Sequence, residues 1–254
     1  MSVTLLPSDF EDRCAEAVQL FWNSRTQLPG DVARQGGSRD AVTSGKNMDG
    51  FVALAEHVAR HVGLRGDTIH TRSRDVVLPG YYRPTKRWDA LVIDRGRLLA
   101  VFEFKSQVGS FGNNFNNRSE EAIGSAADLW VAYKQGGFQR REQAPGSPAD
   151  DPRPPFVGWL MLLEDCEASR TEIKVDEPHY PVFPEFVGAS YARRYQLLCE
   201  RLMQEKLYSA ASLLFSRGDP PSYSSLSEAT SVRSLYLEFA SKIAAAVQSR
   251  ASAP

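Results

Sequence analysis

The sequence has few cysteines, no long apolar run and almost no net charge. Its three cysteines, Cys14, Cys166 and Cys199, lie far apart and form no Cys-x-x-Cys pair. A disulfide framework and a zinc ribbon are therefore not expected, and a reducing cytoplasm is the predicted compartment. No stretch approaches the length of a membrane span, and the N-terminal residues lack the basic region and apolar core of a signal peptide. We expect no association with a membrane.

The formal net charge is −1, from 30 basic and 31 acidic residues. This balance gives no overall field that attracts nucleic acid, although a neutral protein can still carry a local basic groove. Hydrophobic residues make up 42% of the 254 residues and charged residues 24%, which is ordinary for a globular protein. The length suits one large domain or two small ones. We predict a single domain over residues 1–254.

Apolar periodicity predicts the elements of the first half of the chain. Helical spacing of apolar residues predicts helices at 8–22 and at about 48–62, joined by a polar, glycine-rich connection at 35–47. A short strand is expected at 68–71. Two proline-containing turns interrupt residues 75–87, so we expect a loop there.

The second half contains one strand that is apolar throughout. FVGWLMLLE, residues 156–164, shows no alternation and predicts a strand buried on both faces. The five prolines in residues 139–155 indicate a flexible excursion before it. Further helices are predicted from about residue 189, near 206–215 and at 230–248. The order of elements predicts an α/β fold, with a central mixed β-sheet flanked by helices, a core at about 48–165 and a helical C-terminal part at about 189–250.

WDALVIDRGRLLAVFEFK, residues 88–105, predicts a buried β-hairpin that nevertheless carries charge at its open end. Burying a charge is costly unless it is paired or binds a metal. Side chains alternate along a strand, so Glu103 and Lys105 share one face. Asp89 joins them if the hairpin loop has three residues, 95–97, whereas a two-residue loop would send Asp89 and Glu103 to opposite faces. We expect the three-residue loop.

These charged residues suit phosphodiester hydrolysis. Two converging carboxylates repel unless a cation lies between them, and their hard oxygens suit Mg²⁺. A lysine beside that ion can orient or help deprotonate water and offset charge on phosphate. We therefore predict Asp89, Glu103 and Lys105 as catalytic residues, with Asp89 and Glu103 as Mg²⁺ ligands. The alternative is an ion pair between Glu103 and Lys105 at a strand end, with Asp89 capping the hairpin.

Residues that can contact DNA surround the hairpin. SFGNNFNNR, residues 110–118, is predicted to be irregular, with a helix starting at Ser119 and reaching about residue 134. Asparagine and arginine can read base edges, and cations hold phosphates. The predicted DNA-binding residues are Arg83, Lys86, Asn113, Asn114, Asn116, Asn117 and Arg118. The alternatives are a turn-rich loop and a solvated basic loop. Glu56, on the 48–62 helix, is a candidate extra metal carboxylate or an exposed helical residue.

The hairpin resembles the PD-(D/E)xK nuclease core, with Asp89, Glu103 and Lys105 on its three motif positions and Trp-Asp in place of Pro-Asp. More specifically, the chain resembles the XhoI family of type II restriction endonucleases. Five segments carry this resemblance: NMDGF (47–51), LPGYYRPTKRWD (78–89), EFKSQVGSFGNNFNNRSEEAIGSAADLW (103–130), PPFVGWLMLLEDC (154–166) and PHYPVFPEFVGASYARRY (178–195). One departure is the lack of a proline after Gly109, which shortens the following segment by one residue.

The resemblance implies a restriction-endonuclease-like fold and a Mg²⁺-dependent homodimer. Such an enzyme cuts double-stranded DNA at CTCGAG with a staggered break, beside a companion methyltransferase that acts on the same site. A two-fold dimer suits a palindrome because each subunit reads one half-site. Two alternatives remain open: a nuclease of the same fold that selects DNA shape in repair or junction cleavage, and a DNA-binding protein that has lost activity. The intact Asp89, Glu103 and Lys105 count against the second.

Overall fold

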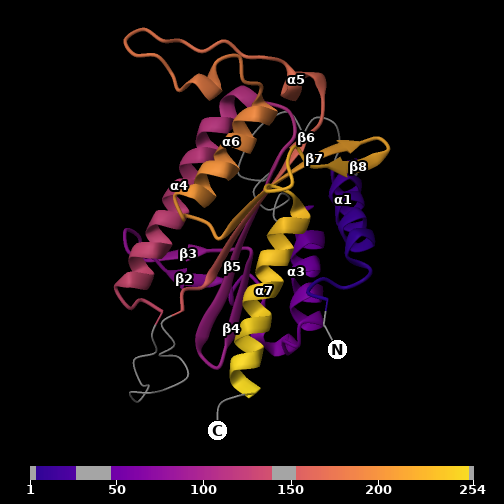
Figure 1. Ribbon diagram of the computed structural model, residues 1–254, viewed down its shortest axis with the longest axis vertical. Coiled ribbons are helices and arrows are strands. Elements are labelled where there is room, and N and C mark those ends of the chain that lie inside the picture. Colours follow the sequence, from indigo (N-terminus) through magenta and orange to yellow (C-terminus); the bar gives the residue numbers. More distant parts are fainter. Residues whose placement is uncertain (1–3, 27–46, 139–152, 252–254) are drawn as a thin grey trace.

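The computed structural model describes residues 4–26, 47–138 and 153–251 (Figure 1). The predicted connection at 35–47 and proline-rich excursion at 139–155 fall almost wholly outside these ranges. A six-stranded sheet in the order β1-β4-β5-β6-β7-β8 lies between two layers of helices. The predicted α/β architecture, with a central mixed sheet flanked by helices, is confirmed. The strands are β1 Ile69–His70, β4 Ala90–Asp94, β5 Arg97–Gln107, β6 Phe156–Glu164, β7 Ala210–Gly218 and β8 Pro221–Ser224.

The middle of the sheet is parallel and its margins are antiparallel. β5 pairs with β6 and β6 with β7 in parallel, whereas β1–β4, β4–β5 and β7–β8 are antiparallel. Parallel strands are covered on both faces, so they need apolar residues at every position. This explains the unbroken apolar run of β6, where every residue except the last is buried.

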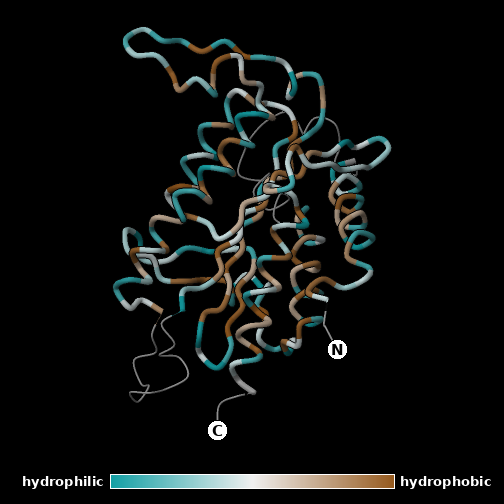
Figure 2. Tube along the Cα trace, in the orientation of Figure 1, coloured by the Kyte–Doolittle hydropathy of each residue, from teal (hydrophilic) through white to brown (hydrophobic). Residues whose placement is uncertain are grey.

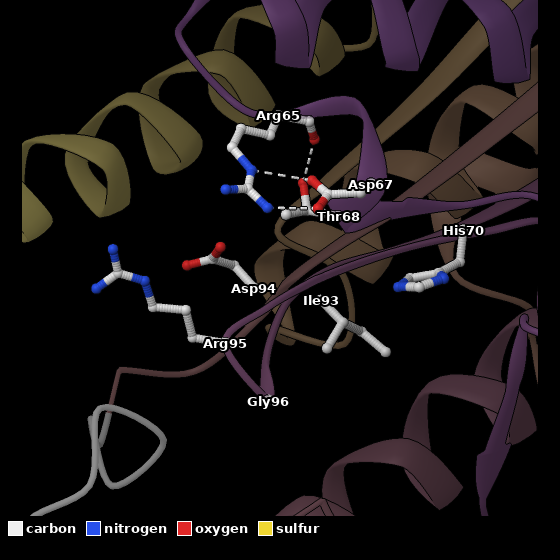
Figure 3. A pocket seen from close by; sticks show the side chains of 8 residues that line it. All are labelled: Arg65, Asp67, Thr68, His70, Ile93, Asp94, Arg95 and Gly96. Carbon is white, nitrogen blue, oxygen red and sulfur yellow. Dashed lines mark hydrogen bonds and ion pairs between the residues drawn. The ribbon is translucent and has the colours of Figure 1, made fainter.

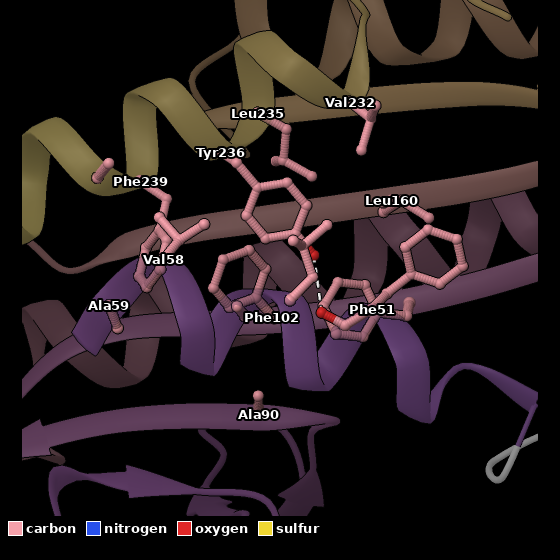
Figure 4. Packing of buried hydrophobic residues seen from close by; sticks show 14 of the residues in the cluster. Phe51, Val58, Ala59, Ala90, Phe102, Leu160, Val232, Leu235, Tyr236 and Phe239 are labelled. Atoms are coloured by element: carbon pink, nitrogen blue, oxygen red, sulfur yellow. Dashed lines mark hydrogen bonds between the residues drawn. The ribbon is translucent and has the colours of Figure 1, made fainter. Parts of the chain in front are cut away.

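Helices cover both faces of the sheet, and the hydropathy trace is brown mainly where they meet it (Figure 2). Helices α1 Phe10–Thr26, α3 Asp49–His61 and α7 Val232–Ala251 share one buried cluster with the sheet. Phe102 lies at the centre of that cluster, where the Tyr236 hydroxyl donates to the Phe51 carbonyl oxygen over 2.8 Å (Figure 4). Helices α4 Phe111–Lys134 and α6 Tyr191–Gln204 pack on the opposite face. Short helical turns are η1 Gly66–Thr68, α5 Glu167–Arg170 and η3 Pro184–Phe186.

The β4–β5 hairpin has a two-residue turn, so the predicted three-residue loop is wrong. Asp94 pairs with Arg97, and the turn residues Arg95 and Gly96 have φ values of 49° and 83°. Positive φ at both central residues is the requirement of a tight hairpin turn of type I′. The register then shifts, because Ile93 pairs with Leu98 but Val92 pairs with Ala100. The extra residue, Leu99, forms a β-bulge, which changes the register as a longer loop would.

Residues 75–87 are not the predicted loop. Strands β2 Val77–Pro79 and β3 Thr85–Arg87 pair with each other in a separate two-stranded sheet. The prolines do not prevent this pairing, since Pro79 ends β2 and Pro84 lies just before β3. Proline is tolerated at strand ends because it removes no central ladder hydrogen bond there.

Two helix predictions also need correction. Helix α4 begins at Phe111 rather than Ser119, because Phe111 and Phe115 pack on Tyr191 and Tyr195 of α6. Tertiary packing thus outweighs the low helix propensity of the asparagines. Residues 206–215 are largely strand β7 rather than helix, so the C-terminal part is not wholly helical. The helices predicted near 8–22, 48–62, from 189 and at 230–248 are confirmed.

Candidate active site

The bulged hairpin brings Asp89 and Glu103 to paired positions. Ala90 pairs with Phe102, and the same register carried one residue further sets Asp89 opposite Glu103. The Asp89 N–H donates to the Phe102 carbonyl over 3.0 Å, and its carboxylate accepts the Phe104 N–H over 2.7 Å. The expected pairing of the two acidic residues is therefore correct, although a bulge rather than a longer loop produces it.

Glu103 is a buried carboxylate with two lysines on one oxygen. Its side chain is 3% exposed, and its Oε1 lies 2.9 Å from the Lys86 Nζ and 3.2 Å from the Lys105 Nζ. The Tyr208 hydroxyl approaches the other oxygen, Oε2, at 3.4 Å. Lys105 reaches Glu103 from the same strand, whereas Lys86 reaches it from β3. The ion pair of Glu103 with Lys105, which the sequence offered as the alternative to a metal site, is present, and Lys86 joins it.

The surroundings shift the pKa values of the two acids in opposite directions. Burial alone would raise the pKa of Glu103, but the charges and hydrogen bonds of Lys105 and Lys86 outweigh it and hold that pKa below its usual value. Burial raises the pKa of Asp89, and the Phe104 N–H and the charge of Lys105 offset this only in part. At Asp89 the effect of burial prevails, whereas at Glu103 the effect of the two ammonium groups prevails.

This pair of carboxylates suits a divalent cation. Asp89 and Glu103 offer hard oxygen ligands, and Mg²⁺ commonly takes one or two carboxylates from a protein and completes its shell with water and phosphate. Burial raises the pKa of Asp89, and a bound cation would favour its ionised form. Over the described ranges, no three or more His, Cys, Asp or Glu side chains gather as a metal site. The residues present fit an ion held by Asp89 and Glu103.

Glu56 lies near Asp89. It comes from α3 and lines, with Asp89 and Arg87, a hollow of about 430 Å³ that Thr71 and Ser73 also border. The candidate extra carboxylate of the sequence is thus on the Asp89 side of the site.

A second hollow, of about 470 Å³, opens beside Glu103 and Lys105. The residues lining it are Tyr82, Arg83, Lys86, Glu103, Lys105, Glu120, Glu121, Gly124, Ser125 and Asp128. Sequence reasoning missed Glu121 and Asp128. Glu121 lies 3.9 Å from the Lys105 Nζ and 2.7 Å from the Arg118 Nη1, so it connects the predicted catalytic lysine to a predicted DNA-binding arginine.

The asparagines lie on the first two turns of α4 rather than in a loop. Asn113, Asn116 and Asn117 are exposed, whereas the Asn114 side chain is partly covered and donates to the Ser110 carbonyl over 3.0 Å. Residues 113, 117, 120 and 124 follow helical spacing, so they form one stripe along the helix. Asn113 and Asn117 therefore continue the stripe that borders the hollow beside Lys105.

A third hollow lies at the turn end of the same hairpin (Figure 3). Arg65, Asp67, His70 and Asp94 contribute to its lining, and Arg65 forms an ion pair with Asp67. It contains none of the predicted catalytic residues. The predicted catalytic residues Asp89, Glu103 and Lys105 lie instead towards the open end of the hairpin.

The comparisons with known proteins agree with one family. Residues 29–226 match the family described as "Restriction endonuclease XhoI". The chain is 49% identical over 197 residues to "Type II restriction enzyme XhoI" of Xanthomonas vasicola, covering 76% of this chain and 75% of that protein. It is 48% identical to "Type II restriction enzyme BstVI" of Geobacillus stearothermophilus, covering 71% and 78%. For "Type II restriction enzyme AbrI" of Azospirillum brasilense, the identity is 47% and the coverage 68% and 75%. No solved structure gives a significant match.

The sequence contains no apolar run as long as a membrane span, and the helices of the described residues agree with this. None of them combines the length and hydropathy that crossing a membrane requires.

Proposed function

The chain belongs to the XhoI family of type II restriction endonucleases, and from this premise we propose that it hydrolyses double-stranded DNA at the palindrome CTCGAG with Mg²⁺. The observation that carries the proposal is Glu103, a 3%-exposed carboxylate with Lys105 at 3.2 Å and Asp89 opposite it in the register. A buried acid, a lysine and a second acid at one strand end are more than a fold requires, because their burial is costly. The same residues would serve phosphodiester hydrolysis.

In this proposal Asp89 and Glu103 hold the divalent cation, which supplies charge neutralisation and a more acidic water when bound. Lys105 orients the attacking water and offsets charge on the phosphate as it becomes pentavalent. Glu121 is a second acidic neighbour of the Lys105 ammonium, at 3.9 Å, and would help to hold it in place. Arg83, Asn113, Asn116, Asn117 and Arg118 are proposed to contact DNA along the hollow and the α4 stripe.

We further propose that the enzyme acts as a homodimer and is accompanied by a methyltransferase that protects the same site. The palindrome supports the first point, since two identical subunits can read two identical half-sites. A nuclease without a protecting partner would cut the DNA of its own host, which supports the second.

The test is a digest of two plasmids that differ by one base pair. One carries a single CTCGAG site, and in the other that site is altered. With Mg²⁺ we expect the first plasmid to become one linear product whose ends map to the site, while the second stays supercoiled. Nicking or fragmentation of both plasmids would instead support the structure-selective nuclease, and an absence of any cutting would contradict a nuclease function.

The roles of the three motif residues are tested by separate substitutions. Asp89→Asn, Glu103→Gln and Lys105→Ala are each expected to slow cleavage by about 100-fold or more. The Lys105→Ala protein should still bind a CTCGAG duplex in Ca²⁺, because its loss leaves both carboxylates in place. Near-normal cleavage by Lys105→Ala would remove that lysine from the mechanism.

A further inference from the structure

Two ammonium groups contact a single oxygen of Glu103. The Lys86 Nζ lies 2.9 Å and the Lys105 Nζ 3.2 Å from Oε1, so Lys86 is the nearer of the two. Lys86 is also well covered, with 13% of its side chain exposed and its ammonium 4.4 Å from the centroid of the Trp88 ring. A lysine held in this way pays side-chain entropy and desolvation. It is therefore a component of the site rather than a surface cation.

The charges of the two paired acids and the two lysines balance without a divalent ion. Lys86 and Lys105 carry two positive charges, and Asp89 and Glu103 carry two negative charges when both are ionised. Both lysines also act on Asp89 through their charges. A divalent ion added to this set would leave an excess of two positive charges at close range, which like-charge repulsion disfavours. One ammonium must then move away from the acids, or phosphate must supply negative charge.

Lys86 is better placed to move than Lys105. Lys105 belongs to β5, which pairs with β4 on one side and β6 on the other, two residues from Glu103 itself. Lys86 belongs to β3, whose one partner strand among the described residues is β2, in a separate two-stranded sheet. Lys86 also lines the 470 Å³ hollow, together with Arg83 and Lys105. A rotation of the Lys86 side chain would carry its charge into that hollow without any change in the main sheet.

We propose that Lys86 is the resident counter-ion of Glu103 in the protein without a divalent ion, and that its ammonium leaves Oε1 for the hollow when a divalent cation binds. There it would contact a phosphate of the bound DNA. This inference rests on the proposed function and deepens it, because Lys86 would pair first with Glu103 and then with a phosphate of the DNA. Lys86 would weaken cation binding in the absence of DNA and support phosphate binding in its presence.

The first measurement is Mn²⁺ binding by the protein without DNA, followed at fixed ionic strength from the electron paramagnetic resonance signal of free Mn²⁺. Lys86→Met removes the competing charge while keeping the apolar stem, so we expect Mn²⁺ to bind about tenfold or more tightly than to the unaltered protein. Lys134→Met is the matched control, since Lys134 is exposed at the end of α4. It should leave Mn²⁺ affinity within about twofold. Glu103→Gln should abolish the tight binding in the Lys86→Met background.

The second measurement is cleavage of CTCGAG DNA at saturating Mg²⁺. Lys86→Met should lower kcat by about tenfold or more, because Lys105 alone is then left to offset the charge of the phosphate. Tighter cation binding together with slower cleavage is the signature of the proposal. If Lys86 had a purely structural role, Lys86→Met would lower both the Mn²⁺ affinity and kcat. Equal or weaker Mn²⁺ binding by Lys86→Met would overturn the proposal, whatever happens to cleavage.

A second neutral variant covers the case in which Lys86→Met does not fold. Lys86→Gln keeps a polar end group and should also bind Mn²⁺ more tightly than the unaltered protein, while Lys86→Arg should not. Failure of the proposed function is separately visible, since the unaltered protein would then leave both plasmids uncut. The Mn²⁺ titration contains no DNA and does not depend on that result.

Discussion

Asp128 and Arg83 form an ion pair, 2.7 Å from Oδ2 to Nε, that joins helix α4 to the turn between β2 and β3. The other oxygen of Asp128 accepts the backbone N–H groups of Tyr81 and Tyr82 at 2.7 and 2.9 Å. The Asp128 side chain is only 5% exposed. Three hydrogen-bond donors thus meet at one buried carboxylate, which fixes the two-stranded sheet against α4 and sets Lys86 beside Glu103.

Asp128→Ala should therefore reduce both stability and cleavage. Loss of the carboxylate leaves the N–H groups of residues 81 and 82 without their acceptor, at a cost of about 1–3 kcal/mol in the free energy of unfolding. Cleavage should fall because the strand that carries Lys86 is no longer fixed. Urea unfolding and a plasmid digest measure the two effects. Asp176→Ala removes an exposed acid and should change stability by no more than about 0.5 kcal/mol. Equal effects of the two substitutions would refute the role given to Asp128.

Base reading by α4 is tested with Asn113→Ala and Asn117→Ala. Both side chains are exposed on the stripe that borders the hollow, so their loss should cost about 1–3 kcal/mol on a CTCGAG duplex. Binding of a random duplex, which depends on phosphate contacts, should change much less. Affinities for the two duplexes are compared at one fixed salt concentration.

Asn114→Ala is the matched control for this experiment. Its amide is bonded to the Ser110 carbonyl, so it supports the start of α4 and should affect both duplexes alike. An equal loss on cognate and random DNA for Asn113→Ala and Asn117→Ala would mean that the stripe only positions the DNA backbone. Recognition would then lie elsewhere, with Arg193 and Arg194 and the 166–189 segment as the next candidates.

The same substitution at two glycines should have opposite effects on stability. Gly158 faces the rings of Phe102 and Phe156, and an added Cβ would come within 2.7 Å of each. Gly158→Ala should thus destabilise the protein by about 1–3 kcal/mol through overpacking. Gly124, within helix α4, has nothing within 4 Å of such an atom, so Gly124→Ala should stabilise the protein by up to about 1 kcal/mol. Thermal unfolding measures both, and a neutral Gly158→Ala would contradict the packing around Phe102.

Asp165 should make stability depend on pH on the acid side. The hydrogen bond from Arg170, aided by Arg217, lowers the pKa of Asp165 against the opposing effect of burial. A depressed carboxyl pKa gives stability that is fully present above the unfolded pKa, about 4, and is lost as the pH falls through the folded pKa. Asp165→Asn should therefore destabilise the protein at pH 7 and have little effect near pH 2. Urea unfolding across this range checks it, and a pH-independent difference would exclude the ion pairs as its cause.

The sequence predicted correctly those features that depend on neighbouring residues. Strand β6 was predicted from its unbroken run of apolar residues, because a strand buried on both faces needs such a run. The charged end of the hairpin was noticed because acidic and basic residues adjoin an apolar stretch, where burying a charge is costly. The start of α4 could not be read in this way. It depends on Phe111 and Phe115 packing against tyrosines about 80 positions away, and nothing in the asparagine-rich segment itself indicates a helix.

Strand β7 and Lys86 illustrate the same limit. The alanines and leucines of residues 210–214 favour a helix by propensity, and only their place beside β6 in the sheet makes them a strand. Lys86 looked like a solvated DNA-binding cation, because its contact with Glu103 requires the pairing of β3 with β2 and the anchoring by Asp128. The bulge at Leu99 has no sequence signal of its own, and the pairing of Asp89 with Glu103 was expected on the basis of a turn that the chain does not form.

That bulge divides the hairpin into two parts with different resistance to local opening. From Ala100 to Phe102 β5 is held on both sides, because its pairing with β6 begins at Ala100 while its pairing with β4 continues to Phe102. Within the described part of the chain, residues 93–98 pair only across the hairpin itself. The outer turn can therefore open and exchange its amide hydrogens with solvent while the inner ladder stays closed. Fluctuation at the tip is thereby kept from reaching the register that sets Asp89 against Glu103.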